Sequence, residues 1–82
     1  MTYRVELTSR ALGQVGGLPD AALDALVVTM AEITGYPDDP LRTFPASDPY
    51  VRRAEFGAVG LVTYLIDDGS ETVTIVDVTW TG

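Results

Sequence analysis

The sequence predicts an α+β domain, in which one strand and two helices precede three further strands. Three observations predict this order. Residues 50–80 hold three alternating runs joined by tight turns, which is the pattern of an antiparallel meander. Residues 2–7 alternate in the same way, and residues 19–34 repeat their apolar side chains with the period of a helix. We therefore expect the order β-α-α-β-β-β, with a helical hairpin packed on a twisted, mainly antiparallel four-stranded sheet.

The first strand is expected to be half buried, because its side chains alternate in polarity. The two faces carry Tyr3, Val5 and Leu7 on one side and Arg4 and Glu6 on the other. A short helix follows, which Thr8 or Ser9 can cap and which ends at a pair of glycines. Its expected inner face is formed by Ala11, Leu12 and Val15.

The second helix is the most regular part of the sequence. Pro19 suits its first turn, and Asp20 and Asp24 lie where the positive end of the helix dipole favours carboxylates. One apolar stripe carries Ala22, Leu23, Leu26, Val27, Met30 and Ile33. We expect this stripe to pack on the sheet, with Leu23, Leu26, Val27 and Met30 near Val62, Tyr64, Ile75 and Val78.

Residues 35–49 should form an ordered but irregular connector on the surface, because they hold four of the five prolines. Tyr36, Leu41 and Phe44 are expected to fix this connector to the core. The three later strands are expected at residues 50–56, 60–67 and 71–79.

The turns and the last strand show finer features. We expect Gly69 to take a positive backbone angle in the turn at residues 67–70, while Gly57 and Gly60 bound the other turn. In the last strand the apolar positions change phase, which indicates either burial on both faces or a β-bulge. These positions are Val73, Ile75, Val76, Val78 and Trp80.

Composition limits the function of the predicted single domain, residues 1–82. The chain has no cysteine and no histidine, which excludes disulfides, thiolate catalysis and the commonest general base. A net charge of −7 opposes nonspecific binding to nucleic acid. No apolar run approaches the ~20 residues of a membrane span and no signal peptide is evident, so we expect a cytoplasmic protein without membrane contact.

We also expect no metal and no cofactor. Acidic pairs occur at Asp38 and Asp39 and within residues 67–71, but neither has the spacing of a known cation site, and turn chemistry accounts for both.

The whole chain resembles the RelE/ParE superfamily of bacterial toxin–antitoxin toxins in the order of its elements. The resemblance rests on the opening TYRVELTSRAL, the helices separated at GGLP, the proline-rich connector, and YVRRAEFGAVGLVTYLIDD followed by a closing strand. It implies two helices packed on a twisted antiparallel sheet and a cognate antitoxin that wraps around the toxin. It also implies one of two activities, since some members cleave mRNA on the ribosome and others poison DNA gyrase.

The catalytic pattern of the RelE-like nucleases matches only in part. Arg52 and Arg53 fit the basic positions of the second strand, and Arg42 lies in the preceding connector. The arginine that the resemblance implies for the third strand falls near Leu61, and the basic tail after the last strand is replaced by Trp80, Thr81 and Gly82. Because the chain has no lysine or histidine, arginines would stabilise charge and carboxylates or tyrosines would transfer protons.

The candidate catalytic residues are therefore Arg42, Arg52, Arg53 and Tyr64, and the candidate partner-binding residues are Arg52, Arg53 and Trp80. Each has a structural alternative. Arg52 and Arg53 lie on opposite faces of one strand, where they can also form salt bridges to Glu55 and Asp77. Tyr64 fits a core aromatic, and Trp80 can either contact a partner or cap the core.

Four functions remain open. We favour a toxin-family protein that acts mainly by protein binding, with a cognate antitoxin and reduced or absent mRNA endonuclease activity. The alternatives are an active ribosome-dependent mRNA endonuclease, a gyrase inhibitor that needs no catalytic residues, and a small domain that associates with itself as a homodimer.

Overall fold

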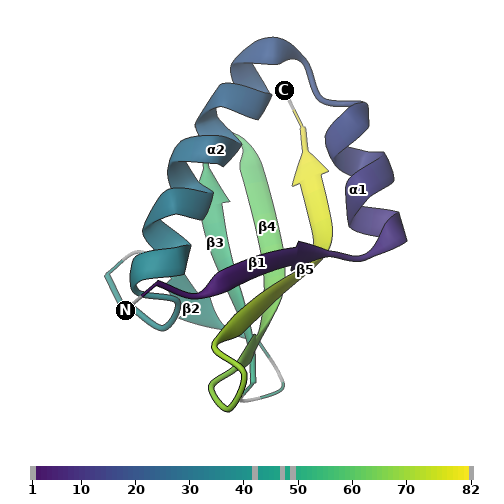
Figure 1. The fold of residues 1–82 in the computed structure, drawn as a ribbon. Coiled ribbons are helices and arrows are strands. Elements are labelled where there is room, and N and C mark those ends of the chain that lie inside the picture. The colour runs from purple at the N-terminus through teal and green to yellow at the C-terminus, as the bar shows by residue number, and fades with distance from the viewer. Residues whose placement is uncertain (1, 42, 47, 49, 82) are drawn as a thin grey trace.

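The computed structural model describes residues 2–41, 43–46, 48 and 50–81. In this part the chain forms two helices and one mixed sheet (Figure 1), which confirms the predicted α+β class. The elements are β1 (Arg4–Leu7), α1 (Ser9–Gly16), α2 (Asp20–Gly35), β2 (Thr43–Pro45), β3 (Val51–Phe56), β4 (Gly60–Asp67) and β5 (Thr72–Trp80).

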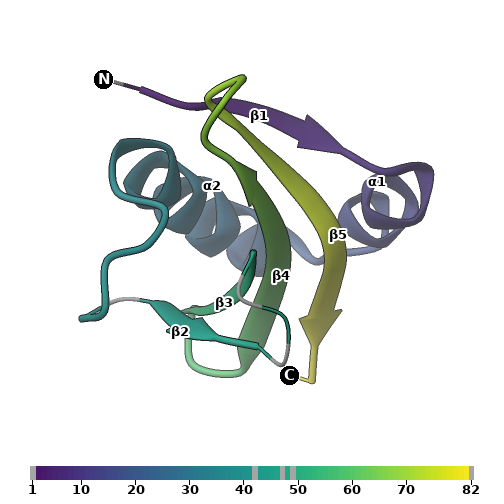
Figure 2. The same cartoon turned by 90° about the horizontal axis from the view of Figure 1, so that it is seen from below.

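The sheet has the strand order β1-β5-β4-β3-β2, and β1 and β2 form its two edges (Figure 2). Strand β1 runs parallel to β5, and every other neighbouring pair is antiparallel. The sheet therefore has one strand more than the four expected. The additional strand is β2, where the connector pairs with β3 in the register Thr43↔Ala54.

Both helices begin near their expected starts. The hydroxyl of Thr8 accepts a hydrogen bond from the amide of Ala11 at 3.1 Å, so Thr8 rather than Ser9 caps α1. Figure 1 shows α2 lying against β3, while α1 lies beside β5. The cap of α2 is Pro19, which supplies no side-chain hydrogen bond.

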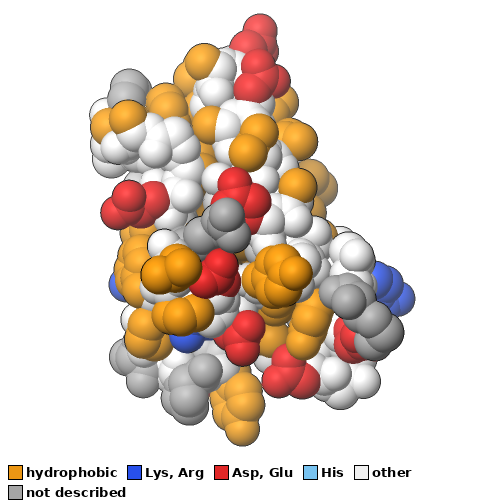
Figure 3. Space-filling view, turned by 90° about the vertical axis from the view of Figure 1, so that its left-hand side faces the viewer, with side chains coloured by type: hydrophobic (Ala, Val, Ile, Leu, Met, Phe, Trp, Pro, Cys, Tyr) orange, Lys and Arg blue, Asp and Glu red, His pale blue; other side chains and the backbone are white. Residues whose placement is uncertain are grey.

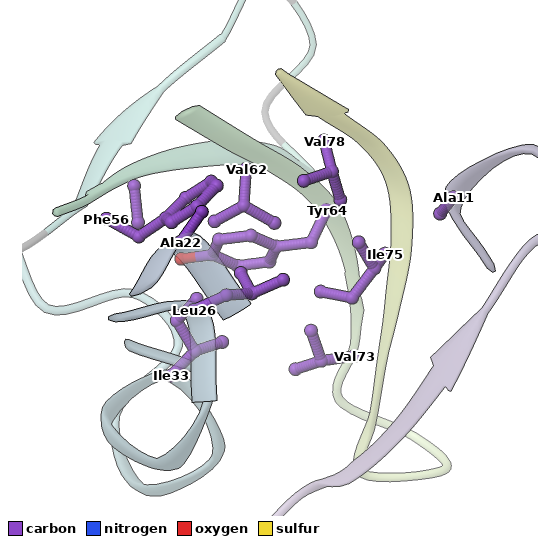
Figure 4. Close-up of a cluster of buried hydrophobic side chains, with 11 residues drawn as sticks. Ala11, Ala22, Leu26, Ile33, Phe56, Val62, Tyr64, Val73, Ile75 and Val78 are labelled. Carbon is purple, nitrogen blue, oxygen red and sulfur yellow. The ribbon is translucent and has the colours of Figure 1, made fainter. Parts of the chain in front are cut away.

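The core lies between α2 and the sheet, and Tyr64 occupies its centre (Figure 4). Leu26 is buried and Leu23 and Met30 are half buried, as expected, but the expectation for Val27 was wrong because its side chain is 59% exposed. Leu12, expected on the inner face of α1, is 63% exposed. Each helix has the sheet on one side alone, so its apolar stripe is wider than the surface available to cover it.

The connector is held differently from the expectation. Tyr36, Leu41 and Phe44 are 69%, 93% and 40% exposed, so they do not fix it to the core. Among the connector residues that the structure describes, Pro37 and Thr43 are buried. Hydrogen bonds from the sheet to these two residues hold the connector, in place of the expected apolar contacts.

Of the two alternatives for the last strand, burial on both faces or a β-bulge, the structure contains the bulge. Thr63 of β4 lies opposite Asp77 and Tyr64 lies opposite Ile75, so Val76 is the additional residue. The turn before β5 differs from the expectation, because the positive backbone angle belongs to Glu71, at φ 51°, instead of Gly69. A hydrogen bond from the Ser70 amide to the Asp67 carboxylate closes this turn at 3.2 Å.

Candidate functional site

Arg52 binds the connector to the sheet. Its Nε donates to Oγ1 of Thr43 at 2.9 Å, and its Nη2 donates to the carbonyl of the same residue at 3.2 Å. The Thr43 hydroxyl in turn donates to the carbonyl of Asp39 at 2.7 Å. The guanidinium therefore binds the first residue of β2 directly and, through the Thr43 hydroxyl, is linked to the loop before that strand. Such charge-assisted bonds are stronger than neutral ones.

Tyr64 lies beside Arg52, since the two residues are cross-strand partners in β3 and β4. Its ring is fully buried, and its hydroxyl donates to the carbonyl of Pro37 at 2.5 Å. Burial raises the pKa of this phenol, although Thr43 and Arg52 act in the opposite direction. At neutral pH Tyr64 is therefore a neutral hydrogen-bond donor whose proton is directed at the connector.

The other arginines are arranged separately. Arg53 follows Arg52 along β3, so its exposed side chain lies on the opposite face, where Phe44 and Thr63 are its cross-strand partners. Arg42 lies outside the described residues. Asp77, considered as a partner for Arg52 or Arg53, instead forms an ion pair with Arg10 of α1 at 3.2 Å. The structure thus brings together Arg52 and Tyr64 but not Arg53.

Trp80 packs on the end of the core. Its ring stacks on Phe56 with a centroid separation of 5.7 Å and an interplanar angle of 25°. The turn at Gly57 lies against the same indole and has a φ of 60°, so the residue suits both the backbone angle and the limited space. The half-buried tryptophan keeps part of its ring accessible.

A second polar cluster joins α1 to the edge of β5. The Gln14 amide donates to Asp77 at 2.9 Å, and its oxygen accepts from the backbone amide of Val78 at 2.7 Å. The Gln14 hydrogen bond is the main cause that lowers the pKa of Asp77, with Thr79 and Arg10 contributing in the same direction. This cluster covers the edge of β5 beyond the end of β1.

A hollow that was not predicted from the sequence lies between the second half of α2 and the paired strands β2 and β3. It has a volume of about 200 Å³ and is lined by Thr29, Glu32, Ile33, Tyr36, Thr43, Ala54 and Glu55. A shallower hollow, lined by Pro40, Leu41, Thr43, Phe44 and Glu55, adjoins it. The sequence signal for this hollow was the spacing of Thr29, Glu32 and Ile33, which places them on one side of a helix.

Within the described residues, no cluster of three or more acidic side chains is placed to hold a metal ion. The same part of the chain contains no helix with the length and apolar character needed to cross a membrane.

The solved structures of RelE proteins that match this chain share its fold. No family model and no curated protein matches the sequence. Among solved structures, the RelBE2 toxin–antitoxin complex from Mycobacterium tuberculosis matches with a TM-score of 0.80 and 27% identity, over 99% of this chain and 100% of that chain. The isolated Escherichia coli RelE toxin matches with a TM-score of 0.84 and 16% identity, over 98% of this chain and 85% of that chain. The chain has the RelE toxin fold.

The likeness extends to an archaeal protein. The RelE–RelB complex from Pyrococcus horikoshii matches with a TM-score of 0.75 and 19% identity, over 100% of this chain and 98% of that chain. In the present chain, Arg52 and Tyr64 both form hydrogen bonds to the connector. Thr43, which accepts the bond from Arg52, also lines the hollow beside α2, so this hollow adjoins the Arg52–Tyr64 pair.

Proposed function

We propose that this protein is a RelE-like toxin-family member that acts in the cytoplasm mainly by protein binding, with a cognate antitoxin, and that its mRNA endonuclease activity is weak or absent. The observation that carries the proposal is the use of Arg52 and Tyr64 within the fold. Arg52 donates hydrogen bonds to Thr43, and Tyr64 donates one to the carbonyl of Pro37, so both side chains hold the connector in place.

RNA cleavage requires a base for the 2′-hydroxyl, stabilisation of charge on phosphorus, and an acid for the leaving oxygen. The chain has no histidine, and a tyrosine with a raised pKa is a poor base at neutral pH. Tyr64 is also fully buried, which separates it from a polymeric substrate. Arg53 is exposed and offers a cation for phosphate, but a single cation does not supply proton transfer.

The proposed partner follows from the matched structures. RelE chains are found with RelB antitoxins in the complexes from Mycobacterium tuberculosis and Pyrococcus horikoshii. A small domain with exposed apolar side chains, such as Leu41 and Tyr50, gains stability when a partner covers them. These two points support a cognate antitoxin for the present chain.

The proposal is tested by expressing the protein in a reporter host and mapping new 5′ ends of mRNA. We expect no codon-phased cleavage from the wild type, and the same pattern from Arg52→Ala and Arg53→Ala. The product of a small neighbouring reading frame should be retained on the tagged protein. Efficient cleavage that is lost in Arg53→Ala would establish the endonuclease instead, and growth arrest with gyrase-linked DNA breaks would establish the gyrase inhibitor.

A further inference from the structure

Strand β2 is the shortest strand of the described sheet. It has three residues and lies at the margin of the sheet next to β3 (Figure 2). Its last residue, Pro45, has no amide hydrogen to donate. Just beyond the strand, the amide of Ala46 donates to the carbonyl of Val51 at 3.0 Å. Because the ladder between β2 and β3 is short, each hydrogen bond is a large share of what holds the strand.

Apolar packing contributes little to the attachment of β2. Phe44, the central residue of the strand, is 40% exposed, and Leu41 in the segment before it is 93% exposed. The hollow of about 200 Å³ is lined by both Thr43 and Ile33, so space remains between the strand and α2. Figure 3 faces this side of the molecule, where orange side chains lie on the surface among red ones. A segment that buries little apolar area has a low local stability.

Polar contacts from the neighbouring strands hold β2 and the connector. The buried Thr43 accepts from Nε of Arg52 at its hydroxyl and from Nη2 of Arg52 at its carbonyl. Farther back in the connector, the carbonyl of Pro37 accepts from the hydroxyl of Tyr64. Arg52 and Tyr64 belong to β3 and β4, which pair with each other over the whole length of β3. The donors thus lie on well-paired strands, and the acceptors lie on a weakly packed segment.

We propose that β2 is a strap that opens from β3 as a unit while the helices and the other strands stay folded, and that each opening releases Arg52 to solvent. Opening replaces the hydrogen bonds between Thr43 and Arg52 by hydrogen bonds to water, so the net cost of each lost bond is small. The open fraction then sets how much of Arg52 is available for a contact outside the fold. This device goes beyond the proposed function, because it requires neither a partner nor RNA cleavage.

Native-state hydrogen exchange in dilute urea tests the opening. The strap reporters are the amides of Thr43 and Ala46, which donate to the carbonyls of Asp39 and Val51. The reporters for the whole fold are the paired amides of β4 and β5. After correction for intrinsic rates, the strap amides should exchange about tenfold faster or more, with little dependence on urea, because a local opening exposes little surface. Equal rates with equal urea dependence in the two groups would overturn the inference.

Two substitutions separate opening of the strap from unfolding of the whole protein. Ile75→Val removes a methyl group from the core, which destabilises the fold whether the strap is open or closed. It should accelerate exchange in β4 and β5 by about fivefold and leave the strap amides unchanged. Thr43→Val keeps the shape of the side chain but removes the hydroxyl, so the strap amides should exchange about tenfold faster. Accelerated strap exchange in Ile75→Val, or unchanged strap exchange in Thr43→Val, would contradict a separate opening unit.

A chemical probe follows Arg52 directly. An arginine-specific dicarbonyl reagent modifies guanidinium groups that are free in solution, and fragmentation of peptides in a mass spectrometer distinguishes Arg52 from Arg53. In the wild type the exposed Arg53 should react about tenfold faster or more than Arg52. Thr43→Val should raise the rate at Arg52 by the factor seen in strap exchange and leave Arg53 unchanged. Equal rates at the two arginines in the wild type, or no response of Arg52 to Thr43→Val, would overturn its release by the strap.

Discussion

At the scale of single residues, Tyr64 and Asp77 are polar groups fixed by specific partners. Tyr64 is a fully buried phenol whose one hydrogen-bond acceptor is the Pro37 carbonyl. Asp77 is partly exposed and receives hydrogen bonds from Gln14 and Thr79. Both arrangements join segments that are distant in the sequence, so their loss is measurable as a change in stability.

Removing the Tyr64 hydroxyl should destabilise the fold. Tyr64→Phe leaves the buried Pro37 carbonyl without its donor, which costs about 1–3 kcal/mol. We expect a lower midpoint in urea unfolding with an unchanged slope. Tyr50→Phe is the control, because Tyr50 is 70% exposed and should change the free energy of unfolding by less than about 0.5 kcal/mol. Equal effects of the two substitutions would contradict the assigned role of Tyr64.

The stability contribution of Asp77 should depend on pH. Its pKa is lowered in the folded protein from the ordinary value of 3.8, with the Gln14 hydrogen bond as the main cause. The contribution is therefore fully present above about pH 4 and is lost as the pH falls through the lower folded pKa. Wild type should be more stable than Asp77→Asn at pH 6, and the difference should shrink at pH 3. A difference that grows on acidification would show that the linkage has the opposite sign.

At the scale of elements, two glycines differ in whether their surroundings leave space for a side chain. Gly13 lies inside α1, where an added Cβ meets no atom within 4 Å. Gly60 begins β4, where an added Cβ would lie 2.6 Å from both the ring and the carbonyl oxygen of Phe56. The turn between β3 and β4 therefore requires glycine for space, whereas α1 does not.

Alanine substitutions at these two positions should have opposite effects. Gly13→Ala should stabilise by about 0.5–1 kcal/mol, because alanine restricts the unfolded chain and favours the helix. Gly60→Ala should destabilise by about 1–3 kcal/mol, because Phe56 and its backbone must move. Thermal unfolding of both variants checks the pair. A neutral Gly60→Ala would mean that the turn relaxes without cost.

At the scale of the whole molecule, charge is unbalanced. Twelve acidic residues against five arginines give the net charge of −7. Self-repulsion in the compact state lowers stability, and dissolved salt screens it.

Raising sodium chloride from about 0.01 M to about 0.15 M shortens the screening length from about 30 Å to about 8 Å. The Tm of the isolated protein should therefore rise, and each 1 kcal/mol corresponds to about 4–8 °C for a domain of this size. An equal osmolality of an uncharged solute is the control. A Tm that falls with salt would mean that attractive ion pairs, such as that between Arg10 and Asp77, outweigh the repulsion.

The sequence by itself determined the class of the fold, the two helices and four of the strands, and it indicated an irregularity in the last strand that the register then placed at Val76. These features follow from periodicity, capping residues and turn residues, which act over a few neighbouring positions. It also placed Arg52 and Arg53 on opposite faces, because successive strand residues alternate.

Only the tertiary structure decided the parallel pairing of β1 with β5, the pairing of the connector as β2, and the exposure of Val27. It also decided that Arg52 binds Thr43, that Tyr64 binds Pro37, and that α2 borders a hollow with Glu32 and Glu55. Each of these depends on contacts between segments far apart in the chain. Local patterns contain no information on which distant segment covers a given face, and the packing of the complete sheet and helices resolves it.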